Sequence, residues 1–250
     1  METNGWEPVS SQKCKGGSSI RSTKGLNMFS LKNLARPLRE LRTVPVILSL
    51  IALAGAQNSA RAQGITIQHQ DALARIDVGS AAGMHDWVVD GVEHLFQQWF
   101  WYRVGSVGGE AAINTISLPS FSTPAANQLS TTYSSGAFNI NILYTLQGGP
   151  AGSGVADIAE QITINNTSGA PLSFHFFQYS DFDLNGSTGG DSVQLLFGPN
   201  QFYVARQTKG LSALVETVTT PAANHGEASV FPGTLNSLND LAPTTLNDVA

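Results

Sequence analysis

The densest group of potential metal ligands lies between Asp181 and Asp191, in the segment DFDLNGSTGGD. Oxygen ligands at alternate positions ahead of a glycine are typical of tight loops that wrap Ca²⁺. This pattern makes Asp181, Asp183, Asn185 and Asp191 candidate ligands of a calcium ion. The segment is not an EF-hand, because the twelfth loop position, which needs a glutamate, is Ser192. The same residue types form turns, so a plain strand end and loop is the alternative.

A second group is the aromatic run from Trp99 to Tyr102, followed by Arg103. In a strand, alternate side chains share a face, which places Trp99 and Trp101 together with Arg103. Exposed coplanar rings beside an arginine would suit stacking against sugar rings, so these three residues are a candidate ligand-binding face. The alternative is that the rings belong to the core, because aromatic side chains bury large apolar areas there and contribute strongly to stability.

Catalysis needs a nucleophile with a base, or two carboxylates at a defined separation in space. The histidines are His69, His85, His94, His175 and His225. None forms an H-x-x-x-H or H-E-x-x-H pair, and there is no G-x-S-x-G motif. Carboxylates such as Asp86, Glu93 and Glu160 are present, but sequence spacing does not set their separation. The sequence therefore assigns no catalytic residue and leaves the question of enzymatic activity open.

Charge is distributed unevenly along the chain. Nine of the 13 Lys and Arg residues lie at or before Arg61, whereas the stretch from residue 63 onward holds four of them against 15 Asp and Glu. An acidic surface without a basic cluster repels phosphate backbones, so nucleic acid is excluded as an expected partner. The single cysteine, Cys14, precedes this stretch, which therefore contains no disulfide, thiolate metal site or cysteine nucleophile.

An export signal is predicted over residues 28–62. Met28 is an alternative start to Met1, four basic residues follow between positions 32 and 42, and an apolar run covers 44–56. Small residues at Ala60 and Ala62 then suit cleavage before Gln63, which completes the secretory pattern. An uncleaved anchor is the alternative, although the run is shorter than the roughly 20 residues that span a bilayer. Contact with the membrane is expected only through this segment during export.

The chain divides into three parts on this interpretation. Residues 1–27 form a polar extension without periodicity, expected to be disordered or to result from a misplaced start. Residues 28–62 form the signal peptide, and 63–250 form a single domain, with truncation at its C-terminus as an alternative to a native end.

Within the domain, apolar residues alternate with polar ones. In Ala137–Leu146 (AFNINILYTL), Phe138 and every second residue to Leu146 share one apolar face. Ala156, Ile158, Ile162 and Ile164 share a second such face, which Glu160 interrupts. Asp90-Gly91 between Trp87–Val89 and Val92–His94 predicts a type I′ hairpin. Further predicted strands are Ile65–Gln68, Leu73–Val78, Leu95–Val104, Ala111–Leu118, Val193–Phe197, Gln201–Arg206, Ala213–Thr219 and Ala228–Phe231.

Ten or so short strands are too many for one open sheet with a solvated face. We therefore predict an all-β fold, an antiparallel β-sandwich of two packed sheets, with a closed β-barrel as the alternative. The segment Leu235–Ala250 has a weak helical pattern that Pro243 interrupts.

Two stretches, Trp87–Arg103 (WVVDGVEHLFQQWFWYR) and Phe177–Asp191 (FQYSDFDLNGSTGGD), together with the export signal, resemble uncharacterised exported bacterial proteins of the PEP-CTERM-associated kind. The sorting tail that defines the group, Pro-Glu-Pro before an apolar helix and a basic end, is absent from this chain. The resemblance implies a location in the envelope or outside the cell, in some members linked to exopolysaccharide. It implies no catalytic residues.

The sequence thus predicts a protein that is secreted, periplasmic or held at the cell surface. Its expected role is that of a structural or interaction protein, with extracellular polysaccharide or other surface proteins as partners. A carbohydrate-binding module and a secreted carbohydrate-active enzyme are the alternatives. No cofactor is expected apart from the Ca²⁺ considered at Asp181–Asp191.

Overall fold

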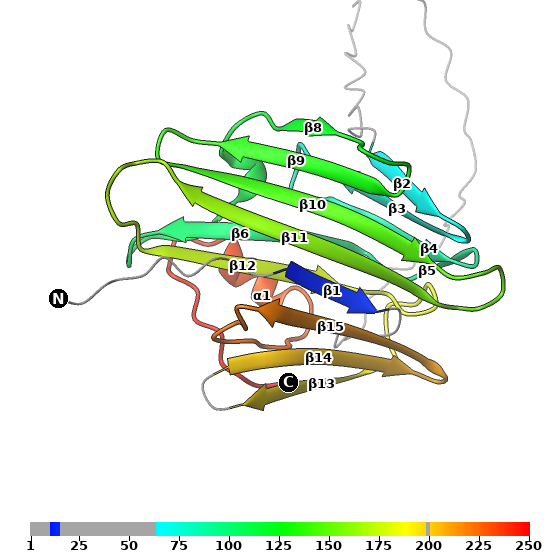
Figure 1. The fold of residues 1–250 in the computed structure, drawn as a ribbon. Coiled ribbons are helices and arrows are strands. Elements are labelled where there is room, and N and C mark those ends of the chain that lie inside the picture. Colours follow the sequence, from blue (N-terminus) through cyan, green and yellow to red (C-terminus); the bar gives the residue numbers. More distant parts are fainter. Residues whose placement is uncertain (1–10, 16–63, 199–200) are drawn as a thin grey trace, which may run out of the picture. The chain divides into compact units, whose positions relative to one another are not determined.

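The computed structural model describes residues 11–15, 64–198 and 201–250, and within these ranges nearly all of the regular secondary structure is strand. The strands form one sheet of eight and one of seven (Figure 1). The predicted signal peptide, 28–62, lies outside the described residues. No described helix is long and apolar enough to cross a membrane.

The eight-stranded sheet has the order β13-β14-β15-β1-β11-β10-β9-β8. Its strands are β1 (Ser11–Lys15), β8 (Ser120–Ser122), β9 (Gln128–Ser134), β10 (Phe138–Gly148), β11 (Ala156–Asn166), β13 (Ser192–Gly198), β14 (Gln201–Lys209) and β15 (Ser212–Thr220). Strand β1 comes from the N-terminal extension that the sequence sets apart from the domain. Its backbone pairs antiparallel with both β11 and β15, and Figure 1 shows it between them.

The seven-stranded sheet has the order β12-β6-β4-β3-β2, with β5 added to β4 and β7 to β6. Its strands are β2 (Ile65–His69), β3 (Ala72–Asp77), β4 (Gly83–Val89), β5 (Val92–Glu93), β6 (Gln97–Val104), β7 (Ala111–Ala112) and β12 (Phe174–Asp181). All described pairings are antiparallel except the short one between β4 and β6. Neither sheet closes on itself, so the two-sheet sandwich is confirmed.

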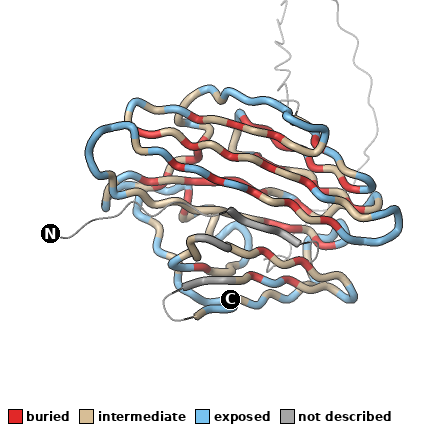
Figure 2. Tube along the Cα trace, in the orientation of Figure 1, coloured by how far each residue is buried: buried red, intermediate tan, exposed pale blue. Residues whose placement is uncertain are grey.

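Alternating burial explains how the two sheets pack. Every second residue of β10, from Phe138 to Leu146, is buried, and β11 repeats the pattern from Ala156 to Ile164. The alternation is visible along both strands in Figure 2. These side chains pack with residues of the other sheet, among them Ile67 and Phe100, in one hydrophobic cluster. Burial of each large apolar side chain contributes roughly 1.5–3 kcal/mol, so this interior stabilises a domain without disulfides.

The predicted hairpin at Asp90-Gly91 is confirmed. Strands β4 and β5 pair across it, and Asp90 and Gly91 have φ values of 50° and 78°. Both values lie in the left-handed region that a type I′ turn requires. The Asp90 carboxylate also accepts backbone hydrogen bonds from Gly152 and Gly154, which tie the β10–β11 loop to this turn.

Two predicted strands differ in the structure. Ala111–Leu118 forms only β7 and a 3₁₀ turn, η1 (Ile113–Thr115), which Thr115 stabilises by donating its hydroxyl to the carbonyl of Ala112. Ala228–Phe231 is not a strand and instead leads into helix α1 (Gly233–Leu238). Asn114 in the first segment accepts a hydrogen bond from Trp99 of β6, and Ser229 in the second accepts the backbone N–H of Thr234 at the start of α1. These contacts prevail over local strand propensity.

Candidate functional site

Trp99 and Trp101 lie in the core, with 0% of each residue exposed. The indole nitrogen of Trp99 donates to Asn114 Oδ1 at 3.1 Å, and that of Trp101 donates to Asn239 Oδ1 at 3.2 Å. The sugar-stacking hypothesis required exposed rings, so these rings do not form a surface platform. The physical reason is that η1 and the segment after α1 cover this face of β6 and satisfy both indole donors.

Arg103, the third residue of that hypothesis, is also buried, but it has a charged partner. Its Nε donates to Glu110 Oε1 at 2.8 Å, and its Nη1 donates to the carbonyl of Gly105 at 2.6 Å. Glu110 in turn accepts hydrogen bonds from the backbone and the hydroxyl of Thr244. Arg103 therefore links β6 to the C-terminal segment, and it also lines the cavity described below.

The predicted calcium loop, Asp181–Asp191, is organised mainly by its contacts with the β5 hairpin and β15. The backbone of Gly186 donates to the carbonyls of Asp183 and Glu93 at 2.9 and 2.7 Å, and Asn185 Oδ1 accepts the hydroxyl of Ser212. Asn185 has φ 62°, a turn conformation.

Its four proposed ligands do not form a recognisable metal site. Asp181 is buried at the end of β12, whereas Asn185 is exposed beyond it. Among the described residues, no group of three or more His, Cys, Asp and Glu side chains is placed to hold a metal ion. The turn alternative therefore describes Asp183, Asn185 and Asp191 better than the calcium-loop hypothesis does.

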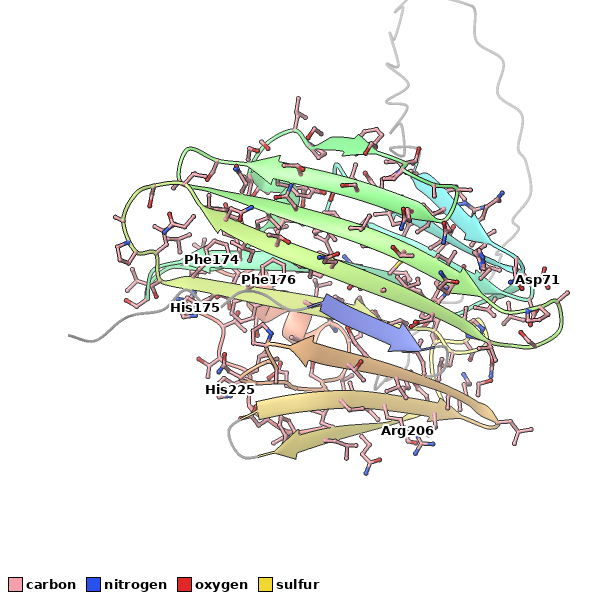
Figure 3. All side chains as sticks on the ribbon, in the orientation of Figure 1. Asp71, Phe174, His175, Phe176, Arg206 and His225 are labelled. Atoms are coloured by element: carbon pink, nitrogen blue, oxygen red, sulfur yellow. The ribbon has the colours of Figure 1, made fainter. Side chains whose placement is uncertain are left out.

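A cavity of about 660 Å³ follows the edge of β12. All eight residues of β12 line it, and β12 has no strand partner on this side among the described residues. Labelled in Figure 3, Phe174, His175 and Phe176 mark one end of the strand. The opposite wall comes from β15 and from the segment 221–234, and Thr244–Leu246 cover it. We call this space the β12 cavity; its volume is in the usual range for small-molecule sites.

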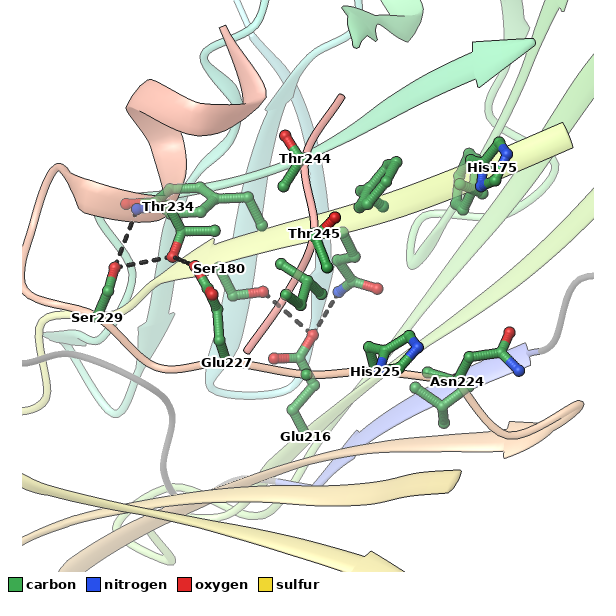
Figure 4. A pocket seen from close by; sticks show the side chains of 18 of the residues that line it. His175, Ser180, Glu216, Asn224, His225, Glu227, Ser229, Thr234, Thr244 and Thr245 are labelled. Atoms are coloured by element: carbon green, nitrogen blue, oxygen red, sulfur yellow. Dashed lines mark hydrogen bonds between the residues drawn. The ribbon is translucent and has the colours of Figure 1, made fainter. Parts of the chain in front are cut away.

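The walls of the β12 cavity combine rings with hydrogen-bonding groups. Phe174, Phe176, Tyr179 and Phe231 provide aromatic surface. Figure 4 shows polar groups that converge on the space from several elements: Ser180 from β12, Glu216 from β15, and Asn224, His225, Glu227 and Thr245 from the C-terminal segment. Among the described lining residues, the carboxylates of Asp181, Glu216 and Glu227 face one Lys or Arg side chain, that of Arg103, besides His175 and His225. Because Arg103 is already paired with Glu110, the cavity disfavours an anionic ligand.

Five polar side chains meet where the cavity reaches the sandwich interior, and we call them the acid cluster. They are Gln98, Glu160, Gln178, Ser180 and Glu216. The Gln178 amide nitrogen donates to Glu216 Oε1 at 2.5 Å and lies 3.3 Å from Glu160 Oε2. Gln98 donates to Glu160 Oε1 at 2.7 Å. Ser180 donates to Glu216 Oε1 at 3.1 Å (Figure 4). One amide thus bridges two carboxyl groups.

Within the described part of the chain, neither carboxyl group has a basic partner. Ion pairs there include Arg75 with Asp86, Arg103 with Glu110 and His225 with Asp248. Burial and, second, the charge of Glu216 raise the pKa of Glu160 to about 8. Burial raises the pKa of Glu216 to about 7, against the hydrogen bond from Ser180, which lowers it. Both groups therefore change protonation near neutral pH, unlike ordinary glutamates.

Other polar groups around the cavity have structural partners. Glu227 accepts the Thr234 hydroxyl and the backbone of Asn247, and Ser229 accepts the backbone N–H of Thr234 at the start of α1. These contacts fix the turn before α1 and form no nucleophile–base pair with a histidine.

Glu160 and Glu216 are not among the site residues that the sequence predicts. A signal for Glu160 was present, since it is the one charge on the apolar face of β11. Glu216 gave a similar signal on β15, because it alternates with Leu214, which is buried, and Val218, which lines the cavity. Comparison with protein-family models, with curated proteins and with solved structures finds no match to this chain.

Proposed function

We propose that this protein is an exported binding module, acting in the periplasm, at the cell surface or outside the cell, and that the β12 cavity holds a short stretch of neutral saccharide. The observation that carries the proposal is the composition of that cavity, in which aromatic walls alternate with hydroxyl, amide and carboxyl groups. Ring faces suit the apolar faces of sugars, and convergent polar groups provide specificity in ligand sites.

Two further features support a neutral, hydroxyl-rich ligand. The acidic lining disfavours phosphate and carboxylate ligands. The resemblance to PEP-CTERM-associated exported proteins is in agreement with an extracellular polysaccharide as the ligand.

A glycan array followed by calorimetric titration tests this function. Ala223→Trp places a large ring in the cavity lining, and we expect it to weaken saccharide binding at least about tenfold, or about 1.4 kcal/mol. Ala151→Trp is the matched control, since Ala151 is exposed in the β10–β11 loop, outside the lining. No binding to any neutral glycan, or equal binding by both variants, would contradict the proposal.

A carbohydrate-active enzyme is the second candidate, favoured by the two nearby carboxyl groups of Glu160 and Glu216. Retaining glycosidases hold two carboxyl groups roughly 5–5.5 Å apart, one of them with a raised pKa. Here the amide of Gln178 lies between the two groups, and Glu160 is 0% exposed, which favours binding over hydrolysis. Release of nitrophenol from aryl glycosides by the wild type, lost in Glu216→Gln, would establish hydrolysis instead.

A further inference from the structure

Strand β1 lies inside the eight-stranded sheet, although it is remote in sequence from both of its neighbours. It pairs antiparallel with β11 on one side and with β15 on the other, as Figure 1 shows. Among the described strands, no pairing joins β11 to β15 directly. Strand β1 therefore continues the hydrogen-bond ladder from β11 to the meander β13–β15. We call the space between β11 and β15 the β1 slot.

The exported protein does not keep β1 if the export proposed above is correct. Residues 11–15 precede the signal peptide predicted at 28–62, and cleavage before Gln63 separates them from the domain. Translation from Met28 would omit them altogether. By either route the slot loses the segment that fills it in the full chain. The inference drawn from this rests on the proposed export and goes beyond the saccharide site.

An unfilled β1 slot would leave two strands without a partner at once. The backbone groups of 157–161 on β11 and of 215–220 on β15 that pair with β1 would lose their hydrogen bonds. The slot borders the interior, because Ile158 and Glu160 of β11 are 0% exposed and Glu216 of β15 is 6% exposed. Unsatisfied backbone groups at a buried position are costly, and a strand with open pairing groups is a template for another chain.

Carboxyl groups lie along both sides of the β1 slot. Asp157 and Glu160 on β11, and Glu216 on β15, each stand opposite a residue of β1 in the strand register. The segment that fills the slot in the full chain, SQKCK, has two lysines and no acidic residue. Charge complementarity therefore favours a basic strand in this position and disfavours an acidic one.

We propose that the β1 slot is a strand-accepting site whose occupant, in the exported protein, is a basic extended segment of another polypeptide. This segment takes the place of Ser11–Lys15, runs antiparallel to β11 and β15, and joins the meander to the rest of the sheet. Peptides add to sheets in this way through main-chain hydrogen bonds, while alternate side chains provide specificity. Since Glu216 and Val218 of β15 line the β12 cavity, the bound strand also supports a wall of that cavity.

A synthetic peptide with the sequence of residues 9–17, carrying Cys14→Ser, is the probe. The full chain is expressed with its leader in a bacterial host, and the N-terminus of the exported protein is determined by mass spectrometry. Fluorescence anisotropy of the labelled peptide then measures binding. We expect an N-terminus at Gln63, one peptide bound per chain, and a melting temperature that rises with peptide concentration.

Peptide variants test the two features of the proposed occupant. Lys13→Pro removes a backbone donor from the ladder, and the double change Lys13→Glu with Lys15→Glu reverses the charge of the peptide. Each is expected to weaken binding at least about tenfold. A second acceptor that does not depend on export is the unprocessed full chain with Lys13→Pro in its own β1, which we expect to bind the unaltered peptide better than the wild-type full chain does.

Amide hydrogen exchange locates the bound strand. We expect slower exchange at 157–161 and 215–220 with peptide present, and unchanged exchange in the edge strand β8. In the acceptor, Asp157→Asn is expected to weaken binding of the basic peptide about threefold to tenfold. Asp240→Asn, the same change at an exposed position outside the slot, should bind as the wild type does. The peptide variants keep the test valid if Asp157→Asn fails to fold.

Three results would overturn the strand-accepting site: no binding by either acceptor at about 1 mM peptide, equal binding of the basic and acidic peptides, or protection confined to other strands. A processed protein that dimerises and excludes the peptide would assign the slot to a second copy and would also refute the proposed occupant. Retention of residues 1–62 in the exported protein would contradict the proposed export and the foreign strand together, whereas loss of peptide binding alone leaves the export unaffected.

Discussion

Gln98 on β6 and Glu160 on β11 join the two sheets of the sandwich through a hydrogen bond of 2.7 Å between Gln98 Nε2 and Glu160 Oε1. Both side chains are almost completely buried, at 1% and 0% exposed. A carboxyl group in this position costs free energy when it ionises, because it is buried and no described basic group compensates its charge. Its protonation is therefore coupled to the stability of the fold.

The first prediction concerns this coupling. In the folded protein the pKa of Glu160 is about 8 and that of Glu216 about 7, against an ordinary value of 4.5. Between these values the folded state binds more protons than the unfolded state, so the free energy of unfolding falls as pH rises from about 4.5 to 8. Each group contributes at most about 1.4 kcal/mol per pH unit. We expect Glu160→Gln to flatten this decline, measured by urea unfolding at pH 5, 6, 7 and 8 without divalent cations.

The same series in Asp240→Asn, which removes an exposed carboxyl group, should keep the wild-type slope. The comparison between variants also cancels His94 and His175, whose pKa values are lowered by burial and act in the opposite direction. An identical pH dependence in wild type and Glu160→Gln would show that the carboxyl group ionises freely.

The second prediction concerns Glu110, which joins Arg103 to Thr244. Burial opposes its ionisation, but hydrogen bonds from Thr244 and Arg103 lower its pKa overall. Glu110→Ala leaves a buried guanidinium unpaired, and we expect a loss of about 3–5 kcal/mol in the free energy of unfolding. We also expect faster proteolysis around Thr244, because the C-terminal segment loses its anchor.

Arg75→Ala is the matched control, since it breaks the surface pair between Arg75 and Asp86. Exposed pairs contribute about 0–1 kcal/mol, so this variant should stay close to the wild type in chemical unfolding. Equal losses in the two variants would refute a special role for the buried pair.

The third prediction separates backbone strain from steric overlap at two glycines. Both Gly83 and Gly91 have positive φ, at 57° and 78°. A Cβ on Gly83 would meet the backbone carbonyl of Gln98 and the ring of Trp99, whereas one on Gly91 meets nothing within 4 Å. We expect Gly91→Ala to cost about 1–2 kcal/mol and Gly83→Ala about 1–3 kcal/mol more, measured by thermal unfolding. Equal costs would mean that β4 and β6 separate easily at this contact.

The fourth prediction concerns Glu93, whose Oε1 accepts backbone hydrogen bonds from Trp87, His94 and Leu95 at 2.8–3.0 Å. Glu93→Ala removes the acceptor for three N–H groups, and we expect it to cost about 3 kcal/mol in guanidinium unfolding. Val92→Ala, at the exposed neighbouring position, should change stability by about 0.5 kcal/mol or less. A neutral Glu93→Ala would mean that other groups take over these donors.

Local pattern was sufficient to predict much of the fold. Alternation along β10 and β11 identified both strands and their buried faces, because the direction of a side chain in a strand depends only on its position along the strand. Asp90-Gly91 identified the hairpin, because positive φ in a turn depends on the turn residues themselves. The number of short strands then favoured two packed sheets. The odd charge at Glu160 was also visible, although its consequence was not.

Tertiary structure alone decided which groups come together. Trp99 and Trp101 alternate with apolar neighbours on β6, so the sequence does not determine which face of that strand is exposed. In the structure, Asn239, which lies 138 residues beyond Trp101 in the chain, covers the Trp101 ring. Likewise, Glu160 meets Gln98 and Gln178 across 62 and 18 residues of chain, through the packing of two sheets. Burial and charge compensation depend on such distant neighbours, and these in turn set whether a carboxyl group is a solvated charge, a proton acceptor near neutral pH or a metal ligand.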